Sequence, residues 1–90
     1  MFEVSVKKSA MKNVVKMPAA EQSKFAALVL SLKENGPMQP SYMNFSKLGQ
    51  DNYHCHLSRK WVACWTNVNG TLTIEVYYVG SRESAPYARH

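Results

Sequence analysis

The sequence lacks any apolar run long enough to cross a bilayer. Its longest apolar stretch, residues 25–32, is interrupted by Ser31 and flanked by Lys24 and Lys33, whereas a membrane-spanning helix needs about 20 apolar residues. The first six residues also lack the basic and then apolar layout of a secretory signal. We therefore expect a cytoplasmic protein with no membrane partner.

Cysteine is scarce, with only Cys55 and Cys64. Cytoplasmic thiols stay reduced and cysteine is often buried, so two free core thiols are expected rather than a disulfide. The sequence contains no CxxC or HExxH motif. His54 and His56 could still form part of a zinc site, but Cys55 alternates away from them and His90 lies at the chain end. We therefore predict neither a metal nor another cofactor.

Long charge runs and low-complexity segments are absent, so the composition does not indicate disorder. Ninety residues are enough for one hydrophobic core, and we expect a single domain spanning residues 1–90. Eleven Lys and Arg against six Asp and Glu give a formal net charge of +5. This charge favours an anionic partner such as nucleic acid, a membrane surface or an acidic protein, without choosing among them.

The first half of the chain predicts a strand followed by two helices. Residues 2–6 alternate between apolar and polar types, which is typical of a half-buried strand. Apolar residues then recur at helical spacing over residues 9–17 and again over residues 18–35. Gly36 is placed to end the second helix. Residues 38–50 show no clear period and predict a surface loop.

The second half predicts three strands joined by turns. Residues 53–58 alternate between apolar and polar types, residues 61–66 are rich in aromatic and other β-favouring types, and residues 72–79 are predicted as the last strand. A tight turn at residues 58–60 joins the first two strands, and Asn69-Gly70 is a strong hairpin signal because both positions of such a turn need positive φ.

The predicted fold class is α+β, in the order strand, helix, helix and a meander of three strands. We expect two helices to cover one face of a mostly antiparallel sheet and to leave the other face open. Tyr53, Trp61 and Trp65 share a phase with apolar neighbours and are expected in the core. Gly80 is expected to end the last strand, and the polar tail over residues 81–87 to add no core element.

Two imidazoles are the first candidates for chemistry. His54 and His56 alternate with Tyr53, Cys55 and Leu57, so they point to the same open face of the sheet. Imidazole can accept or donate a proton near neutral pH, which cleavage of RNA by its own 2′-hydroxyl requires. The competing interpretation is a pair of exposed surface histidines.

Cations and one tyrosine could complete a site on that face. The candidates for phosphate binding are Lys47 in the loop, Arg59 and Lys60 in the turn, and Arg82 after the last strand. Taken singly, each cation could equally be a solvated surface residue. Tyr87 could supply a phenol or a stacking ring for a base of single-stranded RNA, or could only anchor the tail.

Three motifs carry a family resemblance: residues 52–57 (NYHCHL), residues 61–65 (WVACW) and residues 76–83 (VYYVGSRE). With the Lys47-Leu48-Gly49 approach and the order of predicted elements, the chain resembles the RelE-type toxins of bacterial toxin-antitoxin systems, in the RelE/ParE superfamily. The resemblance covers nearly the whole chain.

The resemblance implies a toxin that enters the ribosomal A site and cleaves messenger RNA there, without metal, by 2′-hydroxyl attack on the adjacent phosphate. A cognate antitoxin would neutralise it. By position, His54 and His56 stand where relatives place basic residues, and Arg82 matches the arginine after the last strand. Tyr87 approximates the C-terminal catalytic tyrosine, and Lys47 is a looser match.

One departure from the family pattern is notable. Relatives often carry an arginine on the third strand, where this chain has Trp61-Val62-Ala63. Arg59 or Lys60 could replace that phosphate contact from the adjacent turn. The alternatives are a ParE-like poison of DNA gyrase, a relative that binds without cleaving, and a basic module with no toxic action.

Overall fold

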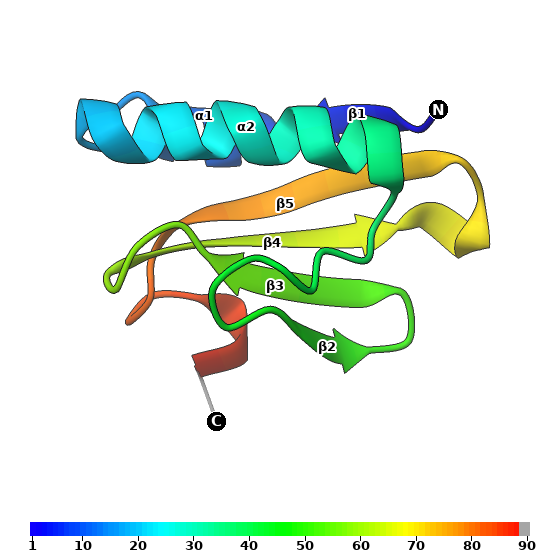
Figure 1. The fold of residues 1–90 in the computed structure, drawn as a ribbon. Helices are drawn as coiled ribbons and strands as arrows, with labels where there is room; N and C mark the ends of the chain where they lie inside the picture. Colours follow the sequence, from blue (N-terminus) through cyan, green and yellow to red (C-terminus); the bar gives the residue numbers. More distant parts are fainter. Residues whose placement is uncertain (89–90) are drawn as a thin grey trace.

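The computed structural model describes residues 1–88 and contains two helices and five strands (Figure 1). The elements in chain order are β1 (Glu3–Val6), α1 (Lys8–Val14), α2 (Ala19–Asn35), β2 (Ser46–Gly49), β3 (Asn52–His56), β4 (Trp61–Asn67) and β5 (Thr73–Ser81). Two short 3₁₀ helices are also present, η1 (Val68–Gly70) before β5 and η2 (Pro86–Ala88) near the C-terminus. None of the helices in residues 1–88 has both the length and the apolar character that a membrane span requires.

The five strands form one sheet in the order β1-β5-β4-β3-β2. β1 pairs with β5 in parallel, and the other neighbours pair antiparallel. The predicted α+β class and the mostly antiparallel sheet are therefore confirmed. β2 is an additional strand within the segment predicted as a loop. Its four residues have no apolar alternation, and their extended form depends on pairing with β3.

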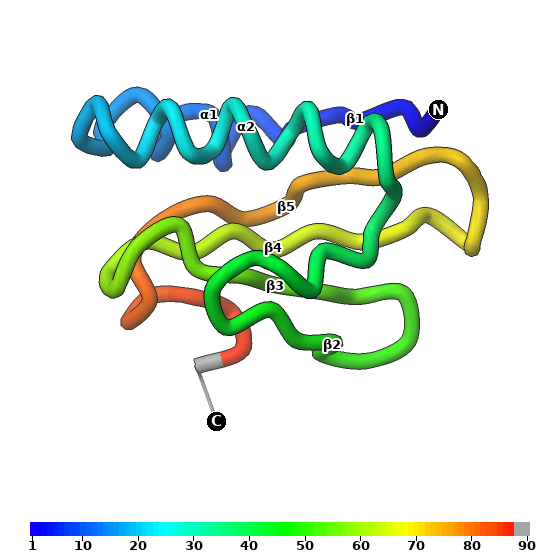
Figure 2. The backbone as a smooth tube through the Cα atoms, in the orientation of Figure 1, coloured from blue at the N-terminus to red at the C-terminus, as the bar shows by residue number. Residues whose placement is uncertain are grey.

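The hydrophobic core lies between the two helices and one face of the sheet. Phe25, Leu28 and Leu32 of α2 pack in one cluster with Tyr53 and Trp65 of the sheet. Trp65 is fully buried and its indole N–H donates to a backbone carbonyl of the α2–β2 connection at 3.0 Å. Figure 2 shows that this connection runs from the end of α2 past β4 and β3 to β2. The core prediction for Tyr53 and Trp65 is confirmed.

The helix ends follow local backbone chemistry. α1 stops at Val14, earlier than the predicted end near Pro18, and Pro18 then stands directly before α2. Gly36 ends α2 with a φ of 87°, and its N–H donates to the Leu32 carbonyl at 3.0 Å. Phe2 packs so closely that a Cβ on Gly36 would lie 2.8 Å from its ring. Glycine is therefore required here both by φ and by packing.

The hairpin between β4 and β5 contains the predicted turn residues. Asn69 and Gly70 both have positive φ, at 49° and 69°, which confirms the reason for expecting them there. β5 continues through Gly80 to Ser81, two residues beyond the predicted end at Val79, so the prediction that Gly80 ends the strand is wrong. The strand stays paired because Gly80 lies opposite Val62 of β4.

The prediction of an open sheet face is wrong, because the chain after β5 returns to the sheet. Ala85 has no exposed surface and Tyr87 contacts His54. The tail therefore adds a buried element, contrary to the expectation from its polar composition. His54 and His56 point away from the helices as predicted, yet each keeps only 8% of its surface exposed.

Candidate functional site

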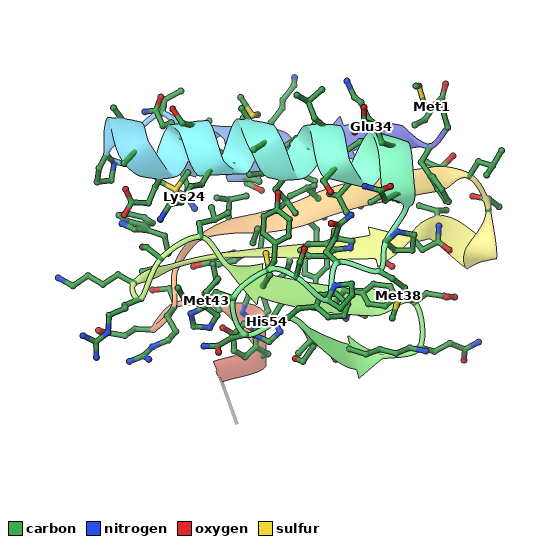
Figure 3. All side chains as sticks on the ribbon, viewed as in Figure 1. Met1, Lys24, Glu34, Met38, Met43 and His54 are labelled. Carbon is green, nitrogen blue, oxygen red and sulfur yellow. The ribbon has the colours of Figure 1, made fainter. Side chains whose placement is uncertain are left out.

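The two candidate imidazoles occupy alternate positions of β3, on the face opposite Tyr53 and Cys55. The register pairs His54 with Cys64 and His56 with Val62 of β4, and directly opposite residues share a face of the sheet. The two imidazole ring centroids are 5.7 Å apart. Figure 3 shows the labelled His54 in the half of the molecule away from the α2 residue Glu34.

Tyr87 covers the imidazole of His54. Their ring centroids lie 4.4 Å apart with an angle of 45° between the ring planes. Tyr87 follows Pro86, whose ring fixes φ, in the first turn of η2. The segment between β5 and η2 therefore places Tyr87 against the sheet face that carries His54 and His56, which we call the histidine face. The predicted grouping of Tyr87 with His54 is present in the structure.

An edge strand that the sequence did not predict orients His54. The Ser46 hydroxyl of β2 lies 2.9 Å from Nδ1 of His54. Whichever of the two groups donates, this hydrogen bond fixes the ring orientation and ties Nδ1 to the protein. Nε2 is consequently the nitrogen of His54 that remains for exchange of a proton with a ligand.

Burial sets the protonation state of His54. Desolvation lowers its pKa below the ordinary value of 6.5, the nearby His56 lowers it further, and a hydrogen bond with the backbone of Ser46 partly opposes both. His54 is therefore neutral at pH 7. A neutral imidazole can accept a proton, as a general base must.

The Tyr87 hydroxyl is buried and has no hydrogen-bond partner among the described residues. Desolvation raises the pKa of Tyr87, and the electrostatic influence of Cys64 adds to the rise, while Arg82 lowers it. The phenol therefore keeps its proton at neutral pH. A buried polar group without a partner is unusual and points to a functional or conformational role.

The predicted cations Arg59, Lys60 and Arg82 gather at one end of the sheet. They line one hollow of about 150 Å³, together with Trp61. The backbone N–H of Arg82 donates to the Lys60 carbonyl at 2.7 Å, which joins the β3–β4 turn to the segment after β5. Figure 3 shows several side chains ending in nitrogen at this end of the molecule. A positive end of this kind can attract a phosphate backbone.

Lys47 does not join this group through the sheet register. It pairs with Tyr53, whereas its neighbour Ser46 pairs with His54. Lys47 therefore leaves the sheet on the side of Tyr53, opposite the imidazoles. Among the predicted phosphate-binding residues it is the one that the register places away from His54.

Two further polar residues on the histidine face were not singled out from the sequence. Tyr77 donates from its hydroxyl to Oδ1 of Asn52 at 2.6 Å. Both line a hollow of about 400 Å³ with Leu48, Pro86 and Tyr87. The period of two could have identified Asn52, because it precedes His54 by two residues in the same strand.

The two cysteines are free and buried, as expected. Burial raises the pKa of both Cys55 and Cys64 to about 12, so neither is a thiolate at neutral pH. Within residues 1–88, no three His, Cys, Asp or Glu side chains are grouped so that they could hold a metal ion. The described residues therefore offer no set of ligands for the zinc site that was considered from the sequence.

No protein-family model matches the sequence. No curated protein matches it either. Solved structures do match the fold. The isolated RelE toxin of E. coli is 14% identical with a TM-score of 0.71, covering 96% of this chain and 89% of RelE. The archaeal RelE–RelB complex of Pyrococcus horikoshii is 15% identical with a TM-score of 0.73, covering 93% and 98%.

A third match is the YoeB–YefM complex of Staphylococcus aureus, at 13% identity and a TM-score of 0.69. It covers 89% of this chain and 95% of the matched chain. At such low identity these similarities concern the arrangement of strands and helices. The chain therefore has the fold of the RelE-type toxins.

Proposed function

We propose that this protein is the toxin of a toxin-antitoxin system and an endoribonuclease that cuts messenger RNA in the ribosomal A site. The observation that carries the proposal is the contact of Tyr87 with His54, at 4.4 Å between ring centroids, on the sheet face that also bears His56. These groups can exchange protons, and Arg82 lies close enough to influence the Tyr87 hydroxyl. The RelE-like fold supports the same class of activity.

The reaction needs one base and one acid. A base removes the proton of the 2′-hydroxyl, and the oxygen attacks the adjacent phosphorus. The bond to the 5′-oxygen then breaks, and an acid returns a proton to that leaving oxygen. The products are a 2′,3′-cyclic phosphate and a 5′-hydroxyl end. In this scheme no metal takes part.

His54 is the proposed base, because its lowered pKa leaves the imidazole neutral at pH 7. Tyr87 or His56 is the proposed acid. The phenol of Tyr87 holds its proton because burial raises its pKa. A positioned acid or base of this type contributes typically about 10²- to 10⁴-fold to a rate.

The role proposed for the cations is phosphate binding. Arg82, Arg59 and Lys60 line one hollow at one end of the sheet and are exposed. In the proposed complex they hold the phosphates next to the scissile bond. Arg82 also stabilises the additional negative charge of the pentacoordinate transition state, a contribution of about 3–4 kcal/mol for a well-placed donor.

Access to the imidazoles requires a local movement. With 8% exposure, His54 cannot contact a ribose while Tyr87 rests on it. We therefore propose that RNA displaces the segment after β5, so that Tyr87 leaves the imidazole and contacts the substrate. Such a movement would also provide partners for the Tyr87 hydroxyl.

The proposed partners are a cognate antitoxin and the ribosome with its messenger RNA. Two of the structural neighbours were solved as complexes, RelE with RelB and YoeB with YefM. This supports an antitoxin for the present chain. The ribosomal A site follows from the family resemblance of the sequence, and the net charge of +5 suits a ribosomal RNA environment.

The test is cleavage of a defined messenger on purified ribosomes, with the new 5′ ends mapped by primer extension. We expect cuts within codons for the unmodified protein, with metal chelator present. Replacing both His54 and His56 by Gln should reduce the cleavage rate by about 10²-fold or more. Lys24→Ala, on an exposed position of α2, is the matched control and should cleave normally.

Two results would count against the proposal. Growth arrest that persists in the double histidine variant would mean that these imidazoles are not part of the toxic activity. Inhibition of DNA gyrase without any messenger cuts would favour the ParE-like alternative.

A further inference from the structure

Trp61 differs from the other tryptophan of the sheet in a way that its core role does not explain. It begins β4 in the same phase as Ala63 and Trp65, which are both fully buried. Trp61 packs against the same core but keeps part of its surface exposed. Trp61 is therefore only partly covered by the fold.

The exposed part of Trp61 lies where three surface hollows meet. One hollow, of about 350 Å³, extends toward Lys16. A second, of about 150 Å³, extends toward Arg82. A third, of about 550 Å³, extends toward Arg59 and Lys60. Trp61 lines all three, so the hollows adjoin one another around this residue and together form a depression at one end of the sheet.

The charges around this depression are mainly positive. Lys16, Arg59, Lys60 and Arg82 line it, against the two carboxylates of Glu21 and Glu83, so the local net charge is 4 − 2 = +2. The four cations are exposed to solvent. Proteins that bind single-stranded RNA commonly combine an aromatic ring, on which a base stacks, with cations that hold the phosphates.

Arg82 links the depression to the histidine face, because it lines a hollow with Trp61 and lies close enough to influence Tyr87, which contacts His54. His56 lies opposite Val62, the residue after Trp61, and Val62 lies opposite Gly80 of β5. The chain from Gly80 to Arg82 therefore leads from the imidazoles to the hollow beside Trp61. A strand of RNA held at the imidazoles and leaving past Arg82 would reach the indole next.

We infer that Trp61 is an RNA-stacking residue. Its indole holds the base of a nucleotide flanking the scissile step of single-stranded RNA, while Lys16, Arg59 and Lys60 hold the phosphates on either side. This inference rests on the proposed function, because it names the part of the same substrate that lies outside the catalytic groups.

The test uses a single-stranded oligoribonucleotide with 2′-O-methyl groups, which cannot be cleaved. Binding is followed by tryptophan fluorescence, which stacking of a base on an indole quenches. We expect quenching of the unmodified protein to come from Trp61, since Trp65 is fully buried. Trp61→Ala should bind roughly tenfold more weakly or worse, in line with the loss of one base–aromatic stack.

Trp61→Phe is the matched variant, because it keeps a stacking ring and removes the fluorophore. It should retain affinity to within a few-fold, measured by fluorescence anisotropy of a labelled oligonucleotide, while the intrinsic quenching disappears. Circular dichroism and the thermal midpoint show whether each variant is folded. If Trp61→Ala does not fold, the Phe variant alone decides, and quenching that survives in it would overturn the inference.

Three other outcomes also test the role of Trp61 and the class of substrate. Equal affinity of the unmodified protein and folded Trp61→Ala would overturn the role of Trp61, even if both cleave messenger on ribosomes. Binding of RNA through Trp61 without any cleavage would keep the inference and reject the proposed nuclease. Quenching by duplex DNA but not by single-stranded RNA would overturn the substrate class.

Discussion

Strand β3 is buried on both of its faces, but the two faces are covered by different means. On one face Tyr53 and Cys55 belong to the same core cluster as the fully buried Leu28 and Leu32 of α2, and Phe45 of the α2–β2 connection stacks on Tyr53 at 6.0 Å between ring centroids. On the other face the chain after β5 returns to the sheet, and Tyr87 rests on His54. The exposed fraction of Tyr53 is 6% and that of His54 is 8%.

Equal burial does not mean equal stability. The helix side excludes water with many apolar groups, which contribute about 25 cal/mol for each Å² buried. The other side covers polar imidazoles and leaves the Tyr87 hydroxyl without a partner among the described residues. Local opening needs least free energy where apolar contacts are few. The comparison therefore indicates that the histidine face can open while the helix side stays intact.

The largest expected change in stability lies on the helix side. Leu28→Ala removes a fully buried side chain from α2 and leaves a cavity, which should lower the free energy of unfolding by about 2–5 kcal/mol. Urea denaturation followed by circular dichroism measures this. Leu30→Ala, at a largely exposed position of the same helix, is the control and should change stability by no more than about 0.5 kcal/mol.

A smaller loss of stability is expected from a substitution on the histidine face. Tyr87→Ala removes a ring that is only partly buried, so the free energy of unfolding should fall by about 1–2 kcal/mol. At the same time His54 should react faster with diethyl pyrocarbonate, because its cover is gone. Leu28→Ala should leave that reaction rate unchanged under native conditions. A loss of stability equal to that of Leu28→Ala would contradict the proposed difference between the two faces.

Removing only the hydroxyl should have a still smaller effect on stability. Tyr87→Phe should leave the free energy of unfolding unchanged or raise it by up to about 1 kcal/mol, since it removes an unpaired buried group. Tyr77→Phe is the matched control, because the Tyr77 hydroxyl donates to Asn52 at 2.6 Å and its loss should cost about 1 kcal/mol. If Tyr87 is the acid of the proposed reaction, only Tyr87→Phe should slow cleavage, by about 10²-fold or more.

The same comparison explains what the sequence could predict. The helix side follows from periodicity, since the spacing of Phe25, Leu28 and Leu32 identifies both the helix and the face that it buries. The direction of His54 and His56 also follows from alternation along β3. These features depend on the spacing of residues that are close in sequence, so the sequence pattern alone is enough to predict them.

The cover of the histidine face does not follow from such patterns. β2 is extended only because Ser46 and Lys47 pair with β3. The chain after β5 returns to the sheet with Ala85 buried and Tyr87 in contact with His54. These contacts join segments distant in sequence, and each segment alone has a polar composition. For the same reason the hydrogen bond between Ser46 and His54 could not be predicted.

The smallest expected effect is a dependence of stability on pH that belongs to His54. Burial lowers its pKa in the folded protein below the ordinary value of about 6.5. Just below that value the unfolded chain binds a proton that the folded protein does not, so stability should fall as the pH drops from 7 and level off below the folded pKa. Urea denaturation between pH 5 and 8 measures this, and His54→Gln should lose that part of the slope. If the unmodified protein and His54→Gln change in parallel over this range, the imidazole is not desolvated in solution, and the face that carries it is open rather than covered.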